Sequence, residues 1–347
     1  MTASPSLAFI AAHITNHRSI GSEHMRAIVA REAGAPAELA EISVEELPAG
    51  DVTVAVSHSS LNYKDALAVT ATGRIVRSFP MVCGVDLAGV VEASDSPHFA
   101  TGDEVIVNGW GLSETHPGGY TQRQRLRSQW LTARPRTLTL AQSMAIGTAG
   151  LAAMLCVLAL ERAGVEPGEA PVLVTGAGGG VGSFAVALLA ALGFTVAAAT
   201  GREELSEQLR ALGASEIVAR GELDQPARPL GSERWAGAID SVGGQVLVNV
   251  LAQTRYRGAV AACGLAGGAE LPATVLPFIL RNVSLLGVDS VMCPSADREL
   301  AWSRLERDLP PGAIEAIATH EPLERVPELA AQLLAGRIRG RVVIDTA

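Results

Sequence analysis

The stretch Pro171–Arg202, PVLVTGAGGGVGSFAVALLAALGFTVAAATGR, decides the fold of this chain. An apolar run, Val172–Thr175, ends in a glycine-rich loop. An apolar helical segment then leads through Gly193 into a second apolar run, Thr195–Ala199. This order of strand, loop, helix and strand predicts an α/β domain with a doubly wound parallel sheet that binds a dinucleotide.

Glycines at three-residue spacing, Gly176, Gly179 and Gly182, mark the loop. Residues without Cβ let the backbone turn sharply and approach a pyrophosphate closely. The spacing departs from the strict G-x-G-x-x-G pattern. The prediction of a dinucleotide site therefore rests on the position of the loop between a strand and a helix. In the alternative interpretation, the glycines only permit tight packing. The residues expected to hold the pyrophosphate are Gly178, Gly179, Gly180 and Val181.

The second strand is followed by Thr200-Gly201-Arg202, which bears on the choice of cofactor. NAD sites usually place Asp or Glu about 20 residues beyond the loop, where it holds the ribose 2′-hydroxyl. A hydroxyl, a backbone N–H and a guanidinium instead favour the 2′-phosphate of NADPH, which a carboxylate would repel. Glu203 and Glu204 oppose this interpretation unless a helix beginning there turns them to solvent.

The composition is that of a globular protein of 347 residues, long enough for two domains with separate cores. The formal net charge of −9 argues against nucleic acid or an anionic membrane as a partner. No apolar run is expected to be long enough to span a bilayer. The four cysteines lie far apart, which predicts reduced thiols in a cytoplasmic enzyme and excludes a four-cysteine structural zinc site. They are Cys83, Cys156, Cys263 and Cys293.

Residues 1–24 differ from the rest of the chain and are predicted to form a leader outside the fold. Its two histidines, His13 and His17, fit a solvated tail better than a metal site. From Arg26 to Ala133, short alternating runs separated by Gly, Pro and Asp predict a compact, barrel-like β domain.

A helical stretch rich in Ala, Leu and Met runs from Thr139 to Ala163, and strands then alternate with helices up to residue 290. Helices are expected around 297–308 and 327–335, followed by a final strand, Arg341–Ile344, that returns to the β domain. The predicted domains are therefore a β domain made of 25–148 and 289–347, and a dinucleotide-binding domain made of 149–288.

Six segments carry a resemblance to a known family: SSLNYKDALAVTATGRIVRSFPMVCGVDLAGVV (59–91), GTAGLAAMLCVLALE (147–161), VTGAGGGVGSFAVALL (174–189), AGAIDSVGG (236–244), VAACGLAGG (260–268) and PFILRNVSLLGVDSV (277–291). They resemble the zinc-free medium-chain dehydrogenase/reductases, most of all the NADPH-dependent acryloyl-CoA reductases, often described as quinone oxidoreductases. The similarity covers Met25 to the end. It implies a GroES-like β-barrel domain around a Rossmann domain, a homodimer, and reduction of an activated C=C bond.

Zinc alcohol dehydrogenases of this superfamily carry a G-H-E motif and a ligand cysteine. This chain has Gly84-Val85-Asp86 and Ser60-Leu61-Asn62-Tyr63 at the corresponding places. A catalytic zinc needs three protein ligands and an open position. His58, Cys83 and Asp86 are a conceivable set, but their spacing matches no known pattern, and we expect no metal.

The resemblance places Tyr63 near the nicotinamide as the candidate catalytic residue. An ordinary phenol keeps its proton at neutral pH. A tyrosine at this place can therefore donate a hydrogen bond to the cofactor or to an enolate oxygen. A packed tyrosine whose hydroxyl caps a loop is the alternative, and water is the alternative proton donor. Asn62, Lys64 and Asp65 form either a polar network that holds the loop or a solvated loop, and Asp86 is expected to be a buried structural partner.

The remaining cofactor contacts are also carried over from the resemblance. Arg220, after the third strand, is either a second clamp on the 2′-phosphate or an exposed surface arginine. Leu265 follows the buried strand that ends at Cys263, where backbone contacts to the nicotinamide ribose are expected because ligands bind beyond such strand ends. Leu285, Ser290 and Arg341 are expected at the nicotinamide end.

The phosphates of coenzyme A have no clear partner in the sequence. Arg123, Arg125, Arg127 and Arg134 are candidates, although alternating arginines in QRQRLR fit the solvated face of a strand better. The predicted activity is NADPH-dependent reduction of an α,β-unsaturated acyl-CoA, acryloyl-CoA to propanoyl-CoA, by hydride transfer without metal. The alternatives are a quinone or enone reductase of the same fold, a non-catalytic NADPH-binding protein and a zinc alcohol dehydrogenase.

Overall fold

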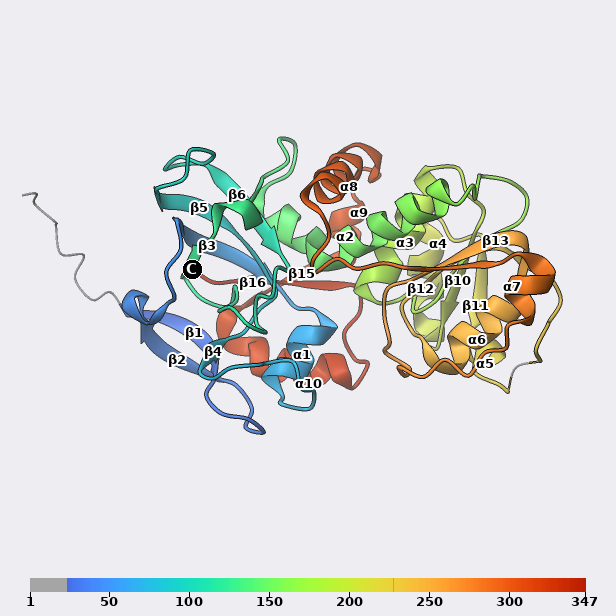
Figure 1. Cartoon of the computed structure of the whole chain (residues 1–347), viewed down its shortest axis with the longest axis horizontal. Coiled ribbons are helices and arrows are strands. Elements are labelled where there is room, and N and C mark those ends of the chain that lie inside the picture. Colours follow the sequence, from blue (N-terminus) through green and yellow to red (C-terminus); the bar gives the residue numbers. More distant parts are fainter. Residues whose placement is uncertain (1–23, 227) are drawn as a thin grey trace, which may run out of the picture.

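The computed structural model describes residues 24–226 and 228–347. These residues form a β-rich part and an α/β part that lie side by side along the long axis of the molecule (Figure 1). The first strand, β1 (His24–Ala30), begins one residue before the predicted start at Met25. The rest of the predicted leader, with His13 and His17, lies outside the described residues.

The α/β part is built on a six-stranded parallel sheet, as predicted from the glycine-loop stretch. In sheet order its strands are β11 (Glu216–Ala219), β10 (Val196–Thr200), β9 (Val172–Val174), β12 (Trp235–Asp240), β13 (Thr254–Ala262) and β14 (Ser284–Gly287). The chain order along the sheet reverses between β9 and β12. A ligand of such a sheet binds beyond the carboxyl ends of the strands at this switch point.

Helices connect the strands of this sheet and cover it (Figure 1). They are α3 (Gly180–Ala191), α4 (Ser206–Ala211), α5 (Arg220–Leu223), α6 (Gly244–Gln253) and α7 (Leu276–Arg281). Strands and connecting helices all fall inside the range 149–288 that was predicted for the dinucleotide-binding domain.

The β-rich part contains a seven-stranded sheet and a three-stranded sheet. The larger sheet consists of β15 (Ala318–Pro322), β16 (Arg341–Asp345), β3 (Val52–Ser60), β5 (Asp86–Ser94), β6 (Glu104–Asn108), β8 (Thr132–Ala133) and β7 (Arg123–Leu126). The smaller one consists of β2 (Glu38–Ser43), β1 and β4 (Met81–Val82). Since β16 pairs antiparallel with β3, the end of the chain returns to this part, as predicted.

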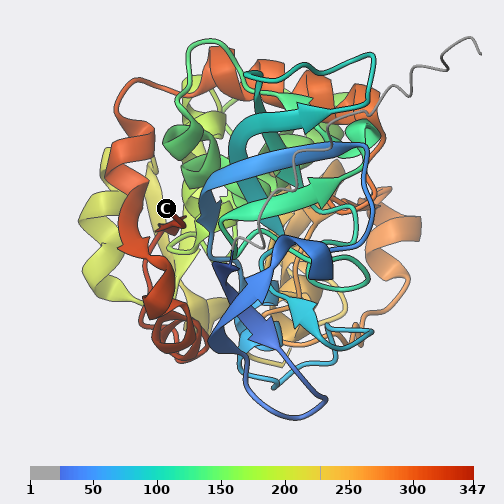
Figure 2. The ribbon, with the colours of Figure 1, turned by 90° about the vertical axis from the view of Figure 1, so that its left-hand side faces the viewer.

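The other helices belong to the β-rich part or join the two parts. They are α1 (Tyr63–Val69), α2 (Leu140–Arg162), α8 (Ser295–Asp308), α9 (Ala313–Ile317) and α10 (Val326–Leu334). Helix α1 packs against α10 and α8 packs against α2. Figure 2 shows the strands of the β-rich part in front and the C-terminal segment, in red, along one side of it.

Helix α2 corrects one expectation from the sequence. Its length and apolar composition meet the criteria for a membrane span, although no such run was expected. In the structure, 89% of its most apolar 18-residue window is buried inside the protein. A helix that is apolar on all sides needs a fully apolar surrounding, and here α3, α8, β3 and β5 supply it. We therefore interpret α2 as a core helix.

Candidate active site between the two parts

Asp86 is the centre of a buried polar network where the β-rich part meets the α/β part. Its carboxylate is completely buried and accepts five hydrogen bonds. The donors are Ser60 Oγ (2.5 Å), Asn62 Nδ2 (2.8 Å), Asn108 Nδ2 (2.7 Å), and the Thr148 backbone N–H (2.9 Å) and hydroxyl. As the sequence suggested, this residue is a structural partner of the segment that carries Tyr63.

Arg341, at the start of β16, is the buried cation of the same network. Its guanidinium lies 4.0 Å from Asp86, and it donates to backbone and side-chain oxygens. The acceptors are the carbonyls of Ala145 (3.0 Å) and Leu61 (2.9 Å), Asn62 Oδ1 (3.0 Å) and Ser60 Oγ (2.7 Å). Burial lowers the pKa of Arg341, while the charge of Asp86 opposes that shift.

Arg341 also reaches the glycine loop. A Cβ on Gly180 would lie 2.7 Å from Arg341 Cδ, so the two residues are in close contact. Arg341, which was predicted at the nicotinamide end, is only 3% exposed. Its side chain contacts both the segment of Asn62 and the glycine loop. From this place it can position the loops that would bind the cofactor.

Tyr63 is the first residue of helix α1 and not part of a loop. Its side chain is 42% exposed, whereas Asp65 of the same turn is fully buried. Asp65 holds the start of the helix by accepting hydrogen bonds from the backbone N–H of Asn62 (3.0 Å) and of Val85 (2.8 Å). Lys64 instead forms an ion pair with Glu114. The turn therefore presents Tyr63 on a rigid support.

Asp65 should make stability depend on pH. Burial, with the nearby charge of Asp86, raises the pKa of Asp65 to about 7. An unfolded aspartate titrates near pH 4, so between about pH 4 and 7 the folded state binds the extra proton. The contribution of Asp65 to the free energy of unfolding should therefore fall as pH rises through this window, by up to about 1.4 kcal/mol per pH unit.

Denaturant unfolding at a series of pH values checks this prediction. The difference in unfolding free energy between wild type and Asp65→Asn should shrink as pH rises from 4 to 7 and stay constant above. The exposed Asp95→Asn serves as the control and should run parallel to wild type. Parallel curves for Asp65→Asn as well would contradict the raised pKa.

The glycine loop has the geometry that a pyrophosphate requires. Gly176 has a positive φ of 60°, and a Cβ on Gly182 would lie 2.3 Å from the carbonyl oxygen of Gly176. A Cβ on Gly178 would lie 2.4 Å from Leu205. Helix α3 begins after Gly179 without a side-chain cap, so the N–H groups of its first turn remain available to an anion. The residues present therefore fit a dinucleotide.

The residues predicted to bind the 2′-phosphate lie together. The Arg202 backbone N–H donates to Thr200 Oγ1 (3.1 Å), and its guanidinium donates to the carbonyl of Gly178 (2.9 Å). The guanidinium of Arg220 lies against Gly201, whose added Cβ would be 3.0 Å from Arg220 Cζ. The two following glutamates are exposed in a 3₁₀ turn, Glu203–Leu205, and the charge of Glu204 acts on the Arg202 guanidinium and opposes the lowering of its pKa by burial.

Asp240, at the end of β12, was not singled out in the sequence. It accepts from the hydroxyl of Thr175 (2.6 Å) and the N–H of Gly243 (2.8 Å), and its carbonyl accepts from the N–H of Cys263 (2.9 Å). It thereby holds the carboxyl ends of β9, β12 and β13 together. Burial raises the pKa of Asp240. The sequence feature that could have identified Asp240 is a carboxylate at the end of an otherwise apolar strand.

The three remaining predicted contacts lie on different segments. Leu265 is 58% exposed just beyond β13, and Leu285 is half-buried in β14. Ser290 lies on the segment that returns to the β-rich part, and its carbonyl accepts from the guanidinium of Arg298 (3.3 Å). Arg298 also donates to the carbonyl of Asn108 (2.9 Å), whose side chain binds Asp86. This buried arginine, missed in the sequence, links Ser290 to the central network.

The conceivable zinc ligands do not fit a metal. The Asp86 carboxylate is saturated by five hydrogen bonds, and burial raises the pKa of the Cys83 thiol to about 12, so it holds its proton. His58 instead lies against Asp345, with Nε2 3.6 Å from Oδ1. Among residues 24–226 and 228–347, no group of three or more His, Cys, Asp or Glu side chains is arranged to hold a metal ion. A thiol needs to lose its proton to bind zinc.

Three of the four arginines considered for coenzyme A contact other side chains. Buried and partly exposed residues alternate along β7, as expected for a strand with one solvated face. Arg123 and Arg125 are partly exposed, and Gln124 and Leu126 are buried. Arg123 binds Glu92 (2.8 Å). Outside the strand, Arg134 binds Glu104 (2.6 Å) and Arg127 lies 5.2 Å from the ring centre of Trp130.

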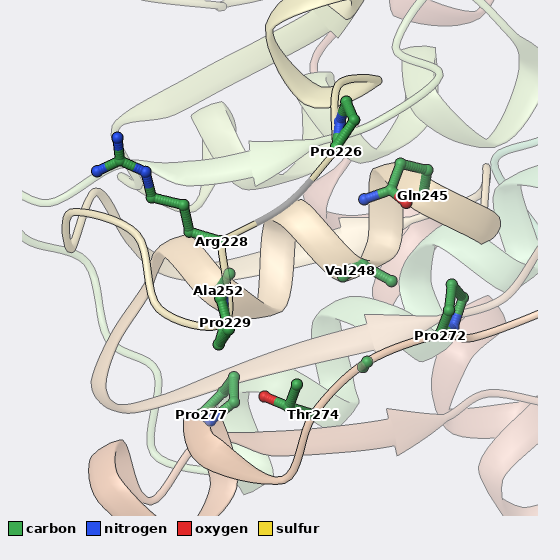
Figure 3. A pocket seen from close by; sticks show the side chains of 10 residues that line it. Pro226, Arg228, Pro229, Gln245, Val248, Ala252, Pro272, Thr274 and Pro277 are labelled. Atoms are coloured by element: carbon green, nitrogen blue, oxygen red, sulfur yellow. The ribbon is translucent and has the colours of Figure 1, made fainter.

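A separate hollow of about 220 Å³ lies on the α/β part, away from this site. Side chains of helix α6, the loop after α5 and the residues around the start of α7 line it (Figure 3). None of the predicted cofactor residues is among them. The hollow is therefore not part of the arrangement around Asp86 and the glycine loop.

Comparison with known proteins agrees with this architecture. The family description "Alcohol dehydrogenase GroES-like domain" matches residues 48–159, and "Zinc-binding dehydrogenase" matches residues 180–307. The acrylyl-CoA reductase AcuI of Ruegeria pomeroyi is 52% identical over 310 residues, which are 89% of this chain and 94% of that protein.

Two solved structures extend the comparison. The yhdH oxidoreductase of Salmonella enterica, in complex with NADP, is 51% identical with a TM-score of 0.91 and covers 93% of this chain and 100% of its own. The yhfP protein of Bacillus subtilis, with NAD bound, is 42% identical with a TM-score of 0.89 over the same shares. The chain therefore belongs to the medium-chain dehydrogenase/reductase family, in the branch that includes AcuI, yhdH and yhfP.

Proposed function

We propose that this protein reduces the C=C bond of an α,β-unsaturated acyl-CoA, acryloyl-CoA to propanoyl-CoA, with NADPH and without a metal. The 52% identity to an acrylyl-CoA reductase over 94% of that protein's length is the observation that carries the proposal. NADPH would supply the hydride. Reduction of a quinone or enone is the second candidate, because a relative named as a quinone oxidoreductase, YhfP, is 45% identical over 92% of its length.

The chain's own residues bind and orient the cofactor in this proposal. The first turn of α3 and the loop before it hold the pyrophosphate, and the arginines beside Gly201 hold the 2′-phosphate. Leu265, Leu285 and Ser290 contact the nicotinamide end. Arg341 and Asp86 act indirectly, because they hold the glycine loop and the start of α1 in position. The pyrophosphate residues are Gly178, Gly179, Gly180 and Val181, and those for the 2′-phosphate are Thr200, Gly201, Arg202 and Arg220.

Tyr63 is the proposed catalytic residue. When a hydride adds to the β-carbon, negative charge develops on the thioester oxygen. A hydrogen-bond donor aimed at that oxygen stabilises the transition state more than the ground state. The exposed phenol at the rigid start of α1 is suited to this task.

The cofactor preference depends on Arg202 in this proposal. Replacing Arg202 by alanine should raise the KM for NADPH about 10- to 100-fold, because a charge-assisted hydrogen bond contributes roughly 1.5–3 kcal/mol. The KM for NADH, which has no 2′-phosphate, should change less than about threefold. Steady-state kinetics with both cofactors measures the two values. Equal losses with NADPH and NADH would show that Arg202 does not recognise the 2′-phosphate.

A substrate comparison tests the proposed reaction directly. The loss of NADPH absorbance is followed with acryloyl-CoA, crotonyl-CoA and a benzoquinone in parallel, with NADH as the control. A kcat/KM for acryloyl-CoA of about 10⁴–10⁸ M⁻¹s⁻¹, far above the others, is expected. Turnover of the quinone alone would remove the acyl-CoA assignment. Tight NADPH binding without turnover of any of the three substrates would instead support a non-catalytic NADPH-binding protein.

The same proposal includes a homodimer in the cytoplasm. Strand β14 ends the six-stranded sheet and offers a free edge to a second copy. Exposed apolar side chains of α7 lie next to it in the chain, among them Ile279 (68% exposed) and Leu280 (58% exposed). Light scattering after size exclusion should give twice the chain mass, and Ile279→Asp should lower it. A monomeric wild type would overturn this part.

A further inference from the structure

The segment Gly336–Gly340 (GRIRG), here called the C-terminal strap, joins α10 to β16 and contacts the nucleotide-binding end of the α/β part. The guanidinium of Arg202 donates to the strap carbonyls of Gly336 (3.2 Å) and Ile338 (2.8 Å). In return, the N–H of Gly340 donates to the carbonyl of Gly178 (3.2 Å). The strap is thus bound to both loops that are expected to meet phosphate.

The strap also carries two cations at this place. Arg337 and Arg339 flank Ile338, and both are exposed. Within the described part of the chain, neither guanidinium has a hydrogen bond or ion pair, in contrast to most of the arginines of the β-rich part. Together with Arg202 and Arg220, they make four arginines on the strap and on the segments next to Gly201, which the strap contacts through Arg202.

We propose that the strap is a phosphate clamp, in which Arg337 and Arg339 bind a phosphomonoester of an adenine nucleotide held at Thr200–Arg202. This inference rests on the cofactor assignment of the proposed function and extends it to residues of the β-rich part. Two donors of Arg202 are already used by the strap carbonyls. The oxygens of a bound phosphate dianion therefore need further donors, and guanidinium groups match phosphate in charge and geometry.

The clamp connects cofactor binding to the catalytic side of the molecule. The strap follows α10, which packs against α1, the helix that begins with Tyr63. It leads directly into Arg341, which is hydrogen-bonded to Asn62. A phosphate bound by the strap would thus fix the β-rich part against the α/β part. Because Thr200–Arg202 is the proposed site of the NADPH 2′-phosphate, the phosphomonoester is that group, and the test separates it from the 3′-phosphate of coenzyme A.

Calorimetric binding of nucleotide fragments tests the clamp. The full-length protein is titrated with 2′,5′-ADP, which carries the phosphate of NADPH, with 3′,5′-ADP, which carries that of coenzyme A, and with NADH. Wild type is compared with Arg337→Gln, Arg339→Gln and the double variant. Arg255→Gln is the matched control, because Arg255 is an exposed arginine near the opposite, amino end of β13.

In the double variant, 2′,5′-ADP should bind about 10- to 100-fold more weakly, whereas a loss confined to 3′,5′-ADP would overturn the assignment to NADPH. NADH should bind as in wild type, and the control variant should bind all three as wild type does. Unchanged affinity for both bisphosphates would overturn the clamp, as would an equal loss with NADH. The fragments do not react, so a failure of acryloyl-CoA reduction would overturn the proposed function and leave this result standing.

Discussion

Replacing Asp86 by alanine is expected to lower the free energy of unfolding by about 3–5 kcal/mol, the range found when a buried charge loses its partner. The carboxylate accepts five hydrogen bonds and compensates Arg341, which is 3% exposed. Without it, the buried guanidinium loses its nearby opposite charge, and several buried donors remain unpaired. Such groups cost more than the interaction itself contributed.

Denaturant unfolding measures this loss, with Asp95→Ala as the matched control. Asp95 is exposed, so its substitution should change the free energy of unfolding by less than about 0.5 kcal/mol. If Asp86→Ala does not fold, Asp86→Asn is measured instead, since its amide keeps one acceptor oxygen. Its free energy of unfolding should lie between the values of Asp86→Ala and wild type. A variant as stable as the Asp95 control would show that the network around Asp86 does not stabilise the fold.

Replacing Tyr63 by phenylalanine should lower kcat for acryloyl-CoA reduction about 100-fold, the size of effect seen when one donor to a developing oxyanion is removed. The KM for NADPH should change little, because the ring and the helix start remain. Asp65 and Asn62 hold that turn without the phenol hydroxyl, so the fold should not be affected. The comparison of kcat with KM therefore separates chemistry from binding.

Tyr256→Phe is the control for this prediction. Tyr256 lies on β13 and is 64% exposed, and its hydroxyl can be removed without touching the site. Pre-steady-state rates of NADPH oxidation, with protein stability checked in parallel, distinguish slow chemistry from slow product release. An unchanged kcat in Tyr63→Phe would assign protonation and oxyanion stabilisation to water or to backbone groups.

The α/β part could be predicted from the sequence because the features that specify it lie close together in the chain. An apolar strand, a glycine loop and an apolar helix follow one another within Pro171–Arg202, and the structure forms β9, α3 and β10 from them. The sequence left open whether Glu203 and Glu204 turn to solvent, and the structure exposes both in a 3₁₀ turn. Such features depend on the backbone freedom of glycine and on the period of apolar residues, both of which act over a few residues.

Other elements were missed where local signals were weak or ambiguous. The turn Asn62–Asp65 reads as a loop, yet it begins α1, because Asp65 accepts the backbone N–H of Asn62. Strands β2 and β15 were not predicted. Both carry exposed or half-buried residues at most positions, which hides the alternation expected of a strand. The apolar α2 was not expected to qualify as a membrane span, and its surroundings in the fold explain its composition.

The sequence by itself determined the class of fold, the glycine loop and the pair Thr200 and Arg202, since neighbouring residues carry these features. Only the tertiary structure decided that Asn62 and Arg341, 279 positions apart, share a hydrogen bond beside Asp86. It also decided that Arg202 binds the strap. Burial strips water from polar groups, and the partners that replace it come from wherever the chain folds back, which no local pattern records.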